Sequence, residues 1–126
     1  MAFVNEVKVK GALPILCTSV ARRKFDEQGI LVATHDEYPE IIRSVAIQEN
    51  VPLVDLEVIT SDWLQDLGVE ESKKVFHKLP AGVSRIYPRG LNDDTHFNEL
   101  GASTVAKLFL QDAEKQEIEE LLKLIK

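Results

Sequence analysis

An aspartate and a histidine, Asp93 and His96, stand three residues apart in the stretch DDTHFNELGASTVA. In a turn that leads into a helix, this spacing lets the carboxylate approach Nδ1 of the imidazole. A carboxylate in that place fixes the tautomer of the ring and stabilises the imidazolium that forms when the ring removes a proton from a nucleophile. The spacing therefore predicts a general base, His96, that is oriented by Asp93.

Two other interpretations of this stretch are open from the residues alone. An acidic, hydroxyl or amide side chain among residues 93–98 can cap the helix that follows, which would leave His96 as a half-exposed surface ring. Asp94 also competes with Asp93 for the imidazole. The spacing by itself does not decide between these alternatives.

A metal site built from Asp93, Asp94 and His96 is the weakest interpretation. Three adjacent ligands on one loop rarely reach one divalent ion without a fourth ligand from elsewhere. The other two histidines, His35 and His77, lie in unrelated segments. We therefore expect no metal and no cofactor.

The composition is that of a soluble globular domain. Of the 126 residues, 44% are apolar and 29% are charged, and no apolar run is long enough to cross a membrane. A formal net charge of −6 argues against nucleic-acid binding, which depends on clustered Lys and Arg. The single cysteine, Cys17, excludes an internal disulfide, and its apolar surroundings predict a buried structural thiol. No secretory signal is visible at the N-terminus, and the localisation stays unknown.

Short apolar runs alternate with longer amphipathic ones along the chain. Residues 11–20 and 51–56 each indicate a strand buried on both faces, and residues 37–50, with Pro39 near their start, indicate a helix between them. A helix that connects two strands of one sheet implies that the strands run parallel. The pattern therefore predicts an α/β fold with parallel strands near 11–20 and 51–56.

The remaining segments predict two more helices and an irregular connection. One helix follows the second strand and ends at Gly68, and a final helix begins near Asn98. The stretch 73–97, which contains the predicted base, is broken by prolines and glycines and predicts irregular structure. A sheet of only two parallel strands does not normally stand alone. We therefore expect a further strand beside residues 11–20.

Longer stretches of the sequence are similar to one family. DDTHFNELGASTVA resembles the last block of the SGNH, or GDSL-like, hydrolases, where an Asp-x-x-His on a loop precedes a helix that opens with Gly. The run KLPAGVSRIYPRGLNDDTHFNELGASTVAKL, with GALPILCTSVARRKFDEQG, THDEYPE and ENVPLVDL upstream, resembles the rhamnogalacturonan acetylesterase branch of the carbohydrate esterases. The resemblance covers nearly the whole chain.

This resemblance implies a fold, a reaction and a substrate. Residues 1–126 would form a single partial SGNH-hydrolase domain, the C-terminal part of a three-layer αβα (flavodoxin-like) sandwich. His96 would be the general base of a serine esterase and Asp93 its orienting acid. The substrate would be an acetylated polysaccharide or oligosaccharide such as rhamnogalacturonan.

The N-terminal part of the family pattern has no counterpart at the start of this chain. The family takes its nucleophile from a Gly-Asp-Ser block, and its oxyanion donors from Gly and Asn blocks that follow it. No serine of this chain stands in a Gly-Asp-Ser, although Ser19, after the first strand, is the best placed to reach an active site. We therefore expect the chain alone to be inactive and its partner to be the missing N-terminal half.

The competing hypothesis is a non-catalytic α/β module that forms a homo-oligomer through its exposed sheet edge. Substrate-binding residues are not identified from the sequence. Arg22 and Arg23 follow the first strand at the end where ligands of open α/β sheets bind. Tyr87 and Arg89 precede the predicted base, and Trp63 is expected to face the core.

Overall fold

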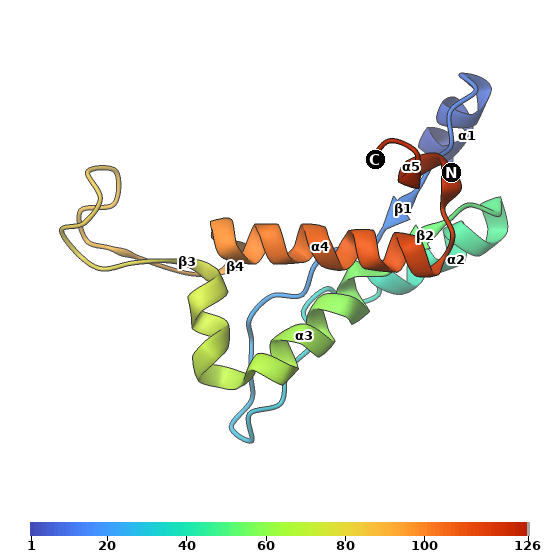
Figure 1. Cartoon of the computed structure of the whole chain (residues 1–126). Coiled ribbons are helices and arrows are strands. Elements are labelled where there is room, and N and C mark those ends of the chain that lie inside the picture. Colours follow the sequence, from blue (N-terminus) through green and yellow to red (C-terminus); the bar gives the residue numbers. More distant parts are fainter. Residues whose placement is uncertain (126) are drawn as a thin grey trace.

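The computed structural model describes residues 1–125, which form helices and two small two-stranded sheets (Figure 1). In chain order the elements are α1 (Ala2–Val9), β1 (Leu16–Cys17), α2 (Tyr38–Glu49), β2 (Leu53–Val54), α3 (Leu56–Glu71), the 3-10 helix η1 (Ser72–Val75), β3 (Phe76–Leu79), β4 (Leu91–Phe97), α4 (Glu99–Lys115) and α5 (Glu119–Leu122). Among these described residues, no helix has the length and apolar character that a membrane span requires.

The first sheet contains the predicted parallel pair. Leu16 of β1 lies opposite Leu53 of β2, and the two strands run in the same direction. The connecting helix, α2, has a proline in its first turn, and Asn50 ends it in the left-handed conformation (φ 48°, ψ 58°). Asparagine tolerates that conformation better than most residues, which explains why the helix ends there. The predicted crossover is therefore confirmed.

The strands are much shorter than predicted, and the expected burial of Cys17 is wrong. Only two residues of each apolar run have strand geometry, and Cys17 is exposed. Within residues 1–125, β1 pairs with β2 alone, so its second edge has no neighbour. A strand without a neighbour on one side leaves its side chains and its backbone groups uncovered. The exposed thiol of Cys17 is on this edge strand, β1.

The prediction of irregular structure for residues 73–97 is wrong. Within this segment β3 and β4 form an antiparallel hairpin. The hairpin extends from the body of the molecule at the end opposite α1, α2 and α5 (Figure 1). The prolines and glycines that indicated irregular structure lie mostly in the loop of residues 80–90 that joins the two strands. The strands themselves are short and partly polar, so no period of two is visible in the sequence.

An aromatic cluster fixes the hairpin to the helices. Phe76 of β3 is 1% exposed and its ring centroid lies 4.7 Å from that of Phe97, the last residue of β4. Trp63 of α3 also packs against Phe97, with ring centroids 5.8 Å apart. Trp63 thus contacts the core, as expected. Packed aromatic rings of this kind fix the approach of one element to another.

The last long helix begins where the sequence predicts. The side chain of Asn98 accepts the backbone N–H of Gly101 at 3.0 Å, which caps α4. The helix ends at Lys115 instead of continuing to the C-terminus, and the short α5 follows after a break at Glu117 (φ 54°). Gly68 also interrupts the helical backbone as predicted (φ 71°), although a further turn of α3 continues to Glu71.

Gly101 allows α4 to approach the start of the hairpin closely. A Cβ at this position would collide with the carbonyl oxygen of Val75 and would lie 2.8 Å from the ring of Phe97. Only glycine has room there, which gives a physical reason for a glycine at the opening of this helix.

Replacing Gly101 with alanine should therefore destabilise the protein, although alanine is the better helix former. We expect the collision to outweigh the gain in helix propensity and to lower the free energy of unfolding by about 1 to 3 kcal/mol, measured by urea denaturation. Ser103→Ala, at an exposed position of the same helix, is the control and should change stability by less than about 0.5 kcal/mol. Equal stability of the Gly101→Ala variant and the parent would refute the close packing.

Candidate active site

Asp93 and His96 lie on a bulge of β4. Between two paired positions of the hairpin, β3 has one residue, His77, and β4 has the four residues 93–96. The additional residues do not pair with β3, and the change in backbone direction at the bulge changes the direction of their side chains. Bulges of this kind are frequent beside active sites for that reason.

The carboxylate of Asp93 holds the bulge and the imidazole together. Its Oδ1 accepts the backbone N–H groups of Thr95 and His96 at 2.7 and 2.9 Å. Its Oδ2 lies 2.7 Å from Nδ1 of His96. An aspartate that accepts the N–H two residues onward forms an Asx turn, which fixes the local backbone. Asp93, and not Asp94, is thus the carboxylate in contact with the imidazole.

These contacts determine the charge of Asp93 and the tautomer of His96. The backbone N–H of His96, then that of Thr95 and then the imidazole, lower the pKa of Asp93 from 3.8 to about 2. The carboxylate is therefore ionised at neutral pH and cannot donate a hydrogen bond. Nδ1 of His96 must be the donor in this contact, and Nε2 of the neutral ring then carries a free lone pair.

The ring is open to incoming molecules. The His96 side chain is 76% exposed, whereas that of Asp93 is 21% exposed. Within residues 1–125, Nε2 has no hydrogen-bond partner, and no serine hydroxyl bonds to this ring. The imidazole thus has an ionised carboxylate at Nδ1 and, among residues 1–125, no serine hydroxyl at Nε2.

Asp94 has a different role from Asp93. Its Oδ1 lies 2.9 Å from a guanidinium nitrogen of Arg23 and 2.8 Å from Nζ of Lys78. Partial burial raises the pKa of Asp94, but the hydrogen bonds from Lys78 and Arg23 outweigh burial and lower it. The backbone carbonyl of Asp94 also accepts the N–H of Arg23 at 2.9 Å. Asp94 therefore anchors the bulge to the loop that follows β1.

Arg23 is itself fixed from two further directions. Its Nε donates to the hydroxyl of the buried Ser72 at 2.9 Å, and its Nη2 donates to the carbonyl of Val69 at 2.6 Å. Of the basic residues predicted near the site, Arg23 thus contacts the bulge directly. No pattern in the sequence predicted that Ser72 or Lys78 would contact these residues.

The remaining candidates lie farther from the imidazole contacts. Tyr87 and Arg89 are on the hairpin loop, where the Tyr87 ring meets the edge of His77 at a centroid distance of 6.4 Å. Ser19 is exposed after β1 and has no side-chain contact with His96.

One match to the family pattern escaped the sequence comparison. Gly90 to Asp93 has the letters Gly-x-Asn-Asp, which are those of the Asn block expected near the N-terminus. In the structure this segment belongs to the hairpin, where the Asn92 side chain accepts from Nζ of Lys78. The letters match the block, but they lie at the start of β4, beside the predicted base His96.

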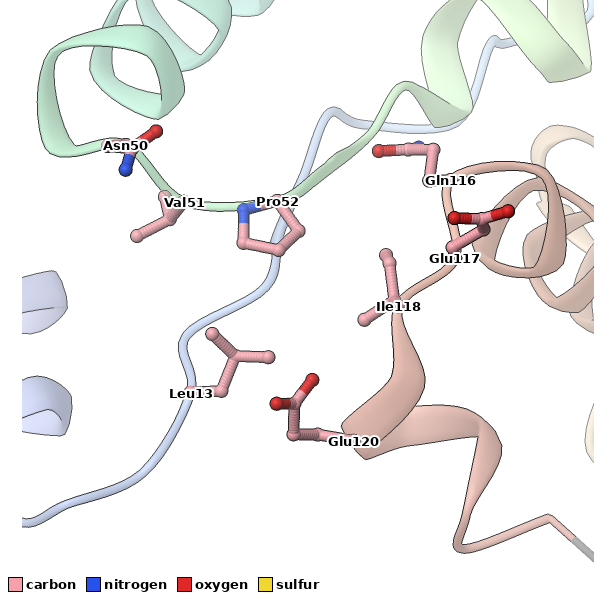
Figure 2. Close-up of a pocket in the computed structure, with 8 residues that line it drawn as sticks. All are labelled: Leu13, Asn50, Val51, Pro52, Gln116, Glu117, Ile118 and Glu120. Atoms are coloured by element: carbon pink, nitrogen blue, oxygen red, sulfur yellow. The ribbon is translucent and has the colours of Figure 1, made fainter.

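A pocket at the other end of the sheet does not adjoin these residues (Figure 2). It lies where β1 and β2 begin, between Leu13, the segment Asn50–Pro52 and the α4–α5 connection with Ile118. Ligands of open α/β sheets bind at the carboxyl ends of the strands, and Arg23 and the bulge lie on that side. Among the described residues 1–125, no group of three or more His, Cys, Asp or Glu side chains is placed to hold a metal ion.

The contacts of Asp93 predict an unusual titration. Carbon-13 NMR of the side-chain carboxyl should show Asp93 titrating near pH 2, with Asp93→Asn as the assignment control. Because the folded pKa lies below the unfolded value, this turn stabilises the fold above about pH 4, and the stabilisation is lost as the pH falls toward 2. A midpoint at or above 3.8 would contradict the three-donor arrangement.

Known proteins resemble this chain in sequence. No family model matches the chain. The rhamnogalacturonan acetylesterase RhgT of Bacillus subtilis (strain 168) is 40% identical over 113 residues, which are 90% of this chain and 49% of RhgT. The probable rhamnogalacturonan acetylesterase YesY of the same organism is 31% identical over 84% of this chain and 44% of its own length. The chain thus spans about half the length of these curated relatives.

The structural comparison gives the same relationship. The crystal structure of the Bacillus subtilis protein YxiM superposes with a TM-score of 0.75 at 28% identity, over 93% of this chain and 30% of that one. YxiM is described as an uncharacterised esterase, and its sequence is 30% identical over 116 residues. The predicted α/β fold of the SGNH type is confirmed. Sequence and structure together show that this chain is homologous to part of these esterases, which include a rhamnogalacturonan acetylesterase.

Proposed function

We propose that this chain is the base-bearing C-terminal portion of an SGNH-type serine esterase that removes acetyl groups from a polysaccharide such as rhamnogalacturonan. The observation that carries the proposal is the 2.7 Å contact between Oδ2 of Asp93 and Nδ1 of His96, which leaves Nε2 exposed and unpartnered within residues 1–125. The substrate class is supported by the names of RhgT and YesY.

In the proposed reaction His96 moves the proton twice. Its Nε2 takes the proton of a serine hydroxyl as the serine oxygen attacks the acetyl carbonyl, and the imidazolium returns that proton to the sugar oxygen that leaves. His96 then takes a proton from a water molecule as that water attacks the acetyl-serine, and the imidazolium returns the proton to the serine oxygen as acetate leaves. Asp93, ionised throughout, stabilises the imidazolium in both halves of the reaction.

The nucleophile and the oxyanion donors come from outside these 126 residues in this proposal. The sequence contains no Gly-Asp-Ser, and no serine hydroxyl among residues 1–125 bonds to His96. A general base that has no hydroxyl to deprotonate contributes almost nothing to catalysis. We therefore propose that the chain by itself is inactive.

Two uncovered surfaces support a complementing partner. The free edge of β1 is one, and the other is an apolar groove of about 510 Å³ on α4, lined by Phe97, Val105 and Phe109 among others. The residues that line the groove lie between Phe97 and Leu110, together with Leu56, on the part of α4 nearer the hairpin (Figure 1). The occupant proposed for both surfaces is the nucleophile-bearing half of the same fold, because the relatives are about twice as long as the match.

A second candidate function rests on the same exposed edge. A non-catalytic module can cover the β1 edge and the α4 groove by pairing with another copy of itself. This alternative requires no active site. The two functions differ in the partner they require. A module that pairs with itself would cover the β1 edge and the α4 groove in a purified sample of the chain alone.

Supplying the missing nucleophile should restore esterase activity. We expect no hydrolysis of an aryl acetate by the chain alone, and turnover when it is co-expressed with the part of RhgT that it does not match. His96→Ala should lower that turnover by about 10⁴-fold or more, and Asp93→Asn by about 10³- to 10⁴-fold. Asp62→Ala, an exposed aspartate on α3, is the control and should have no effect.

Two outcomes would overturn this account. Robust turnover by the isolated chain that His96→Ala abolishes would contradict the proposed inactivity. A stable homodimer in size-exclusion chromatography that excludes the RhgT part would favour the non-catalytic module instead.

A further inference from the structure

The loop that joins β3 and β4 ends in a positively charged, partly apolar tip. This hairpin tip, residues 83–89, carries Ile86 with 81% of its surface exposed. Arg85 and Arg89 lie on the same tip, and neither forms an ion pair in the part of the chain that the structure describes. The segment 72–92 contains five Lys or Arg residues and no Asp or Glu, on a chain of net charge −6. Positive charge is thus concentrated at this protrusion.

Hydrogen bonds within the loop give the hairpin tip a defined shape. The hydroxyl of Ser84 accepts the backbone N–H groups of Ile86 and Tyr87, each at 3.2 Å. The backbone N–H of Gly82 donates to the carbonyl of Pro88 at 3.0 Å. A surface that is ordered before it binds loses less conformational entropy on binding. The hairpin tip can therefore bind a complementary surface at a low entropic cost.

The pocket at the start of β1 and β2 has complementary properties (Figure 2). It has a volume of about 440 Å³, and Leu13, Pro52 and Ile118 contribute to its apolar lining. Glu117 and Glu120 line the same pocket and are exposed. Neither carboxylate forms an ion pair within the described residues. The pocket thus combines apolar contacts with two negative charges.

The wall that carries the two glutamates is fixed to the rest of the molecule. Nε2 of Gln116 donates to the carbonyl of Leu53 at 2.8 Å, which joins the end of α4 to β2. Ile118 is buried and packs in one core cluster with Val54 and Ala113. The shape of the pocket is therefore defined before anything docks there.

The hairpin tip and the pocket lie at opposite ends of the molecule. The helix α4 runs between them, from the hairpin to α5 (Figure 1). The tip therefore cannot enter the pocket of its own chain, and a contact between the two surfaces requires a second copy. A contact between two different surfaces repeats head to tail, which produces open chains or rings instead of a two-fold dimer.

We propose that the hairpin tip of one copy of this chain docks into the pocket of a second copy. Ile86 enters the apolar part of the pocket, and the two arginines of the tip pair with the two glutamates. The tip has seven residues, whereas stable interfaces use about 20 to 30 on each side, so the association is weak and depends on concentration. This docking does not depend on the proposed reaction, and it leaves the β1 edge and the α4 groove free.

Sedimentation equilibrium of the full chain tests the docking directly. At low salt, the weight-average mass should rise above the 14.2 kDa of one chain as the concentration increases, without a plateau at twice that mass. Added salt should lower the mass, because it screens the attraction between exposed charges.

Reversing the charge of each surface identifies the groups that pair. The variants Arg85→Glu, Arg89→Glu and Glu117→Lys, Glu120→Lys should each weaken association at least tenfold, because like charges then face each other. An equimolar mixture of the two variants should associate again, since the tip of each variant then meets a pocket of opposite charge. Recovery in the mixture cannot come from a loss of folding or from a change in net charge alone.

The control variant is Lys24→Glu, Lys107→Glu, which changes the net charge as much as the tip variant does. Both lysines are exposed and lie outside the tip and the pocket, so association should be unchanged. Because all the substituted side chains are exposed, urea denaturation should show the parent's stability in every variant.

Three results would each overturn the docking. The first is a parent chain that stays at 14.2 kDa at every concentration at low salt. The second is undiminished association of either charge-reversed variant, and the third is a mixture that associates no better than its components. Failed complementation with the RhgT part would overturn the proposed reaction and leave the docking standing, so the two failures are distinguishable.

Discussion

The contact between Arg23 and Asp94 joins the loop that follows β1 to the bulge of β4 that carries Asp93 and His96. Arg23 is held by Ser72 and by the end of α3, and it binds both the backbone and the carboxylate of Asp94. The loop after β1, the end of α3 and the bulge of β4 are therefore one rigid unit. The contacts of Asp94 fix the bulge to the loop after β1. Asp93 therefore holds His96 through hydrogen bonds within the bulge, and these bonds do not involve strand pairing.

What this unit does depends on surfaces that the chain leaves uncovered. The imidazole of His96 is exposed, the edge of β1 is free within residues 1–125, and an apolar groove lies on α4. The relatives RhgT and YesY are about twice as long as the part that this chain matches. We propose one explanation for the uncovered surfaces and for a base, His96, that has no nucleophile within residues 1–125. It is a partner that supplies a strand, an apolar surface and a nucleophile together.

Local sequence signals predicted the local features well. The Asp-x-x-His spacing, the crossover helix ending at Asn50 and the cap at Asn98 each depend on residues near one another in the chain. The features that sequence reasoning missed depend on distant contacts. The β3–β4 hairpin depends on strand pairing and the anchoring role of Asp94 depends on Arg23, and neither leaves a periodic pattern. Cys17 is exposed on β1, which has a single neighbouring strand within residues 1–125.

The central claim is that Asp93 keeps His96 ready to accept a proton at Nε2. Nitrogen-15 NMR of the imidazole, recorded well above neutral pH, reports directly which ring nitrogen carries the proton. The structure predicts that Nδ1 is protonated and Nε2 is not, and that Asp93→Asn removes this preference. A neutral ring protonated mainly at Nε2 in the parent protein would contradict the account.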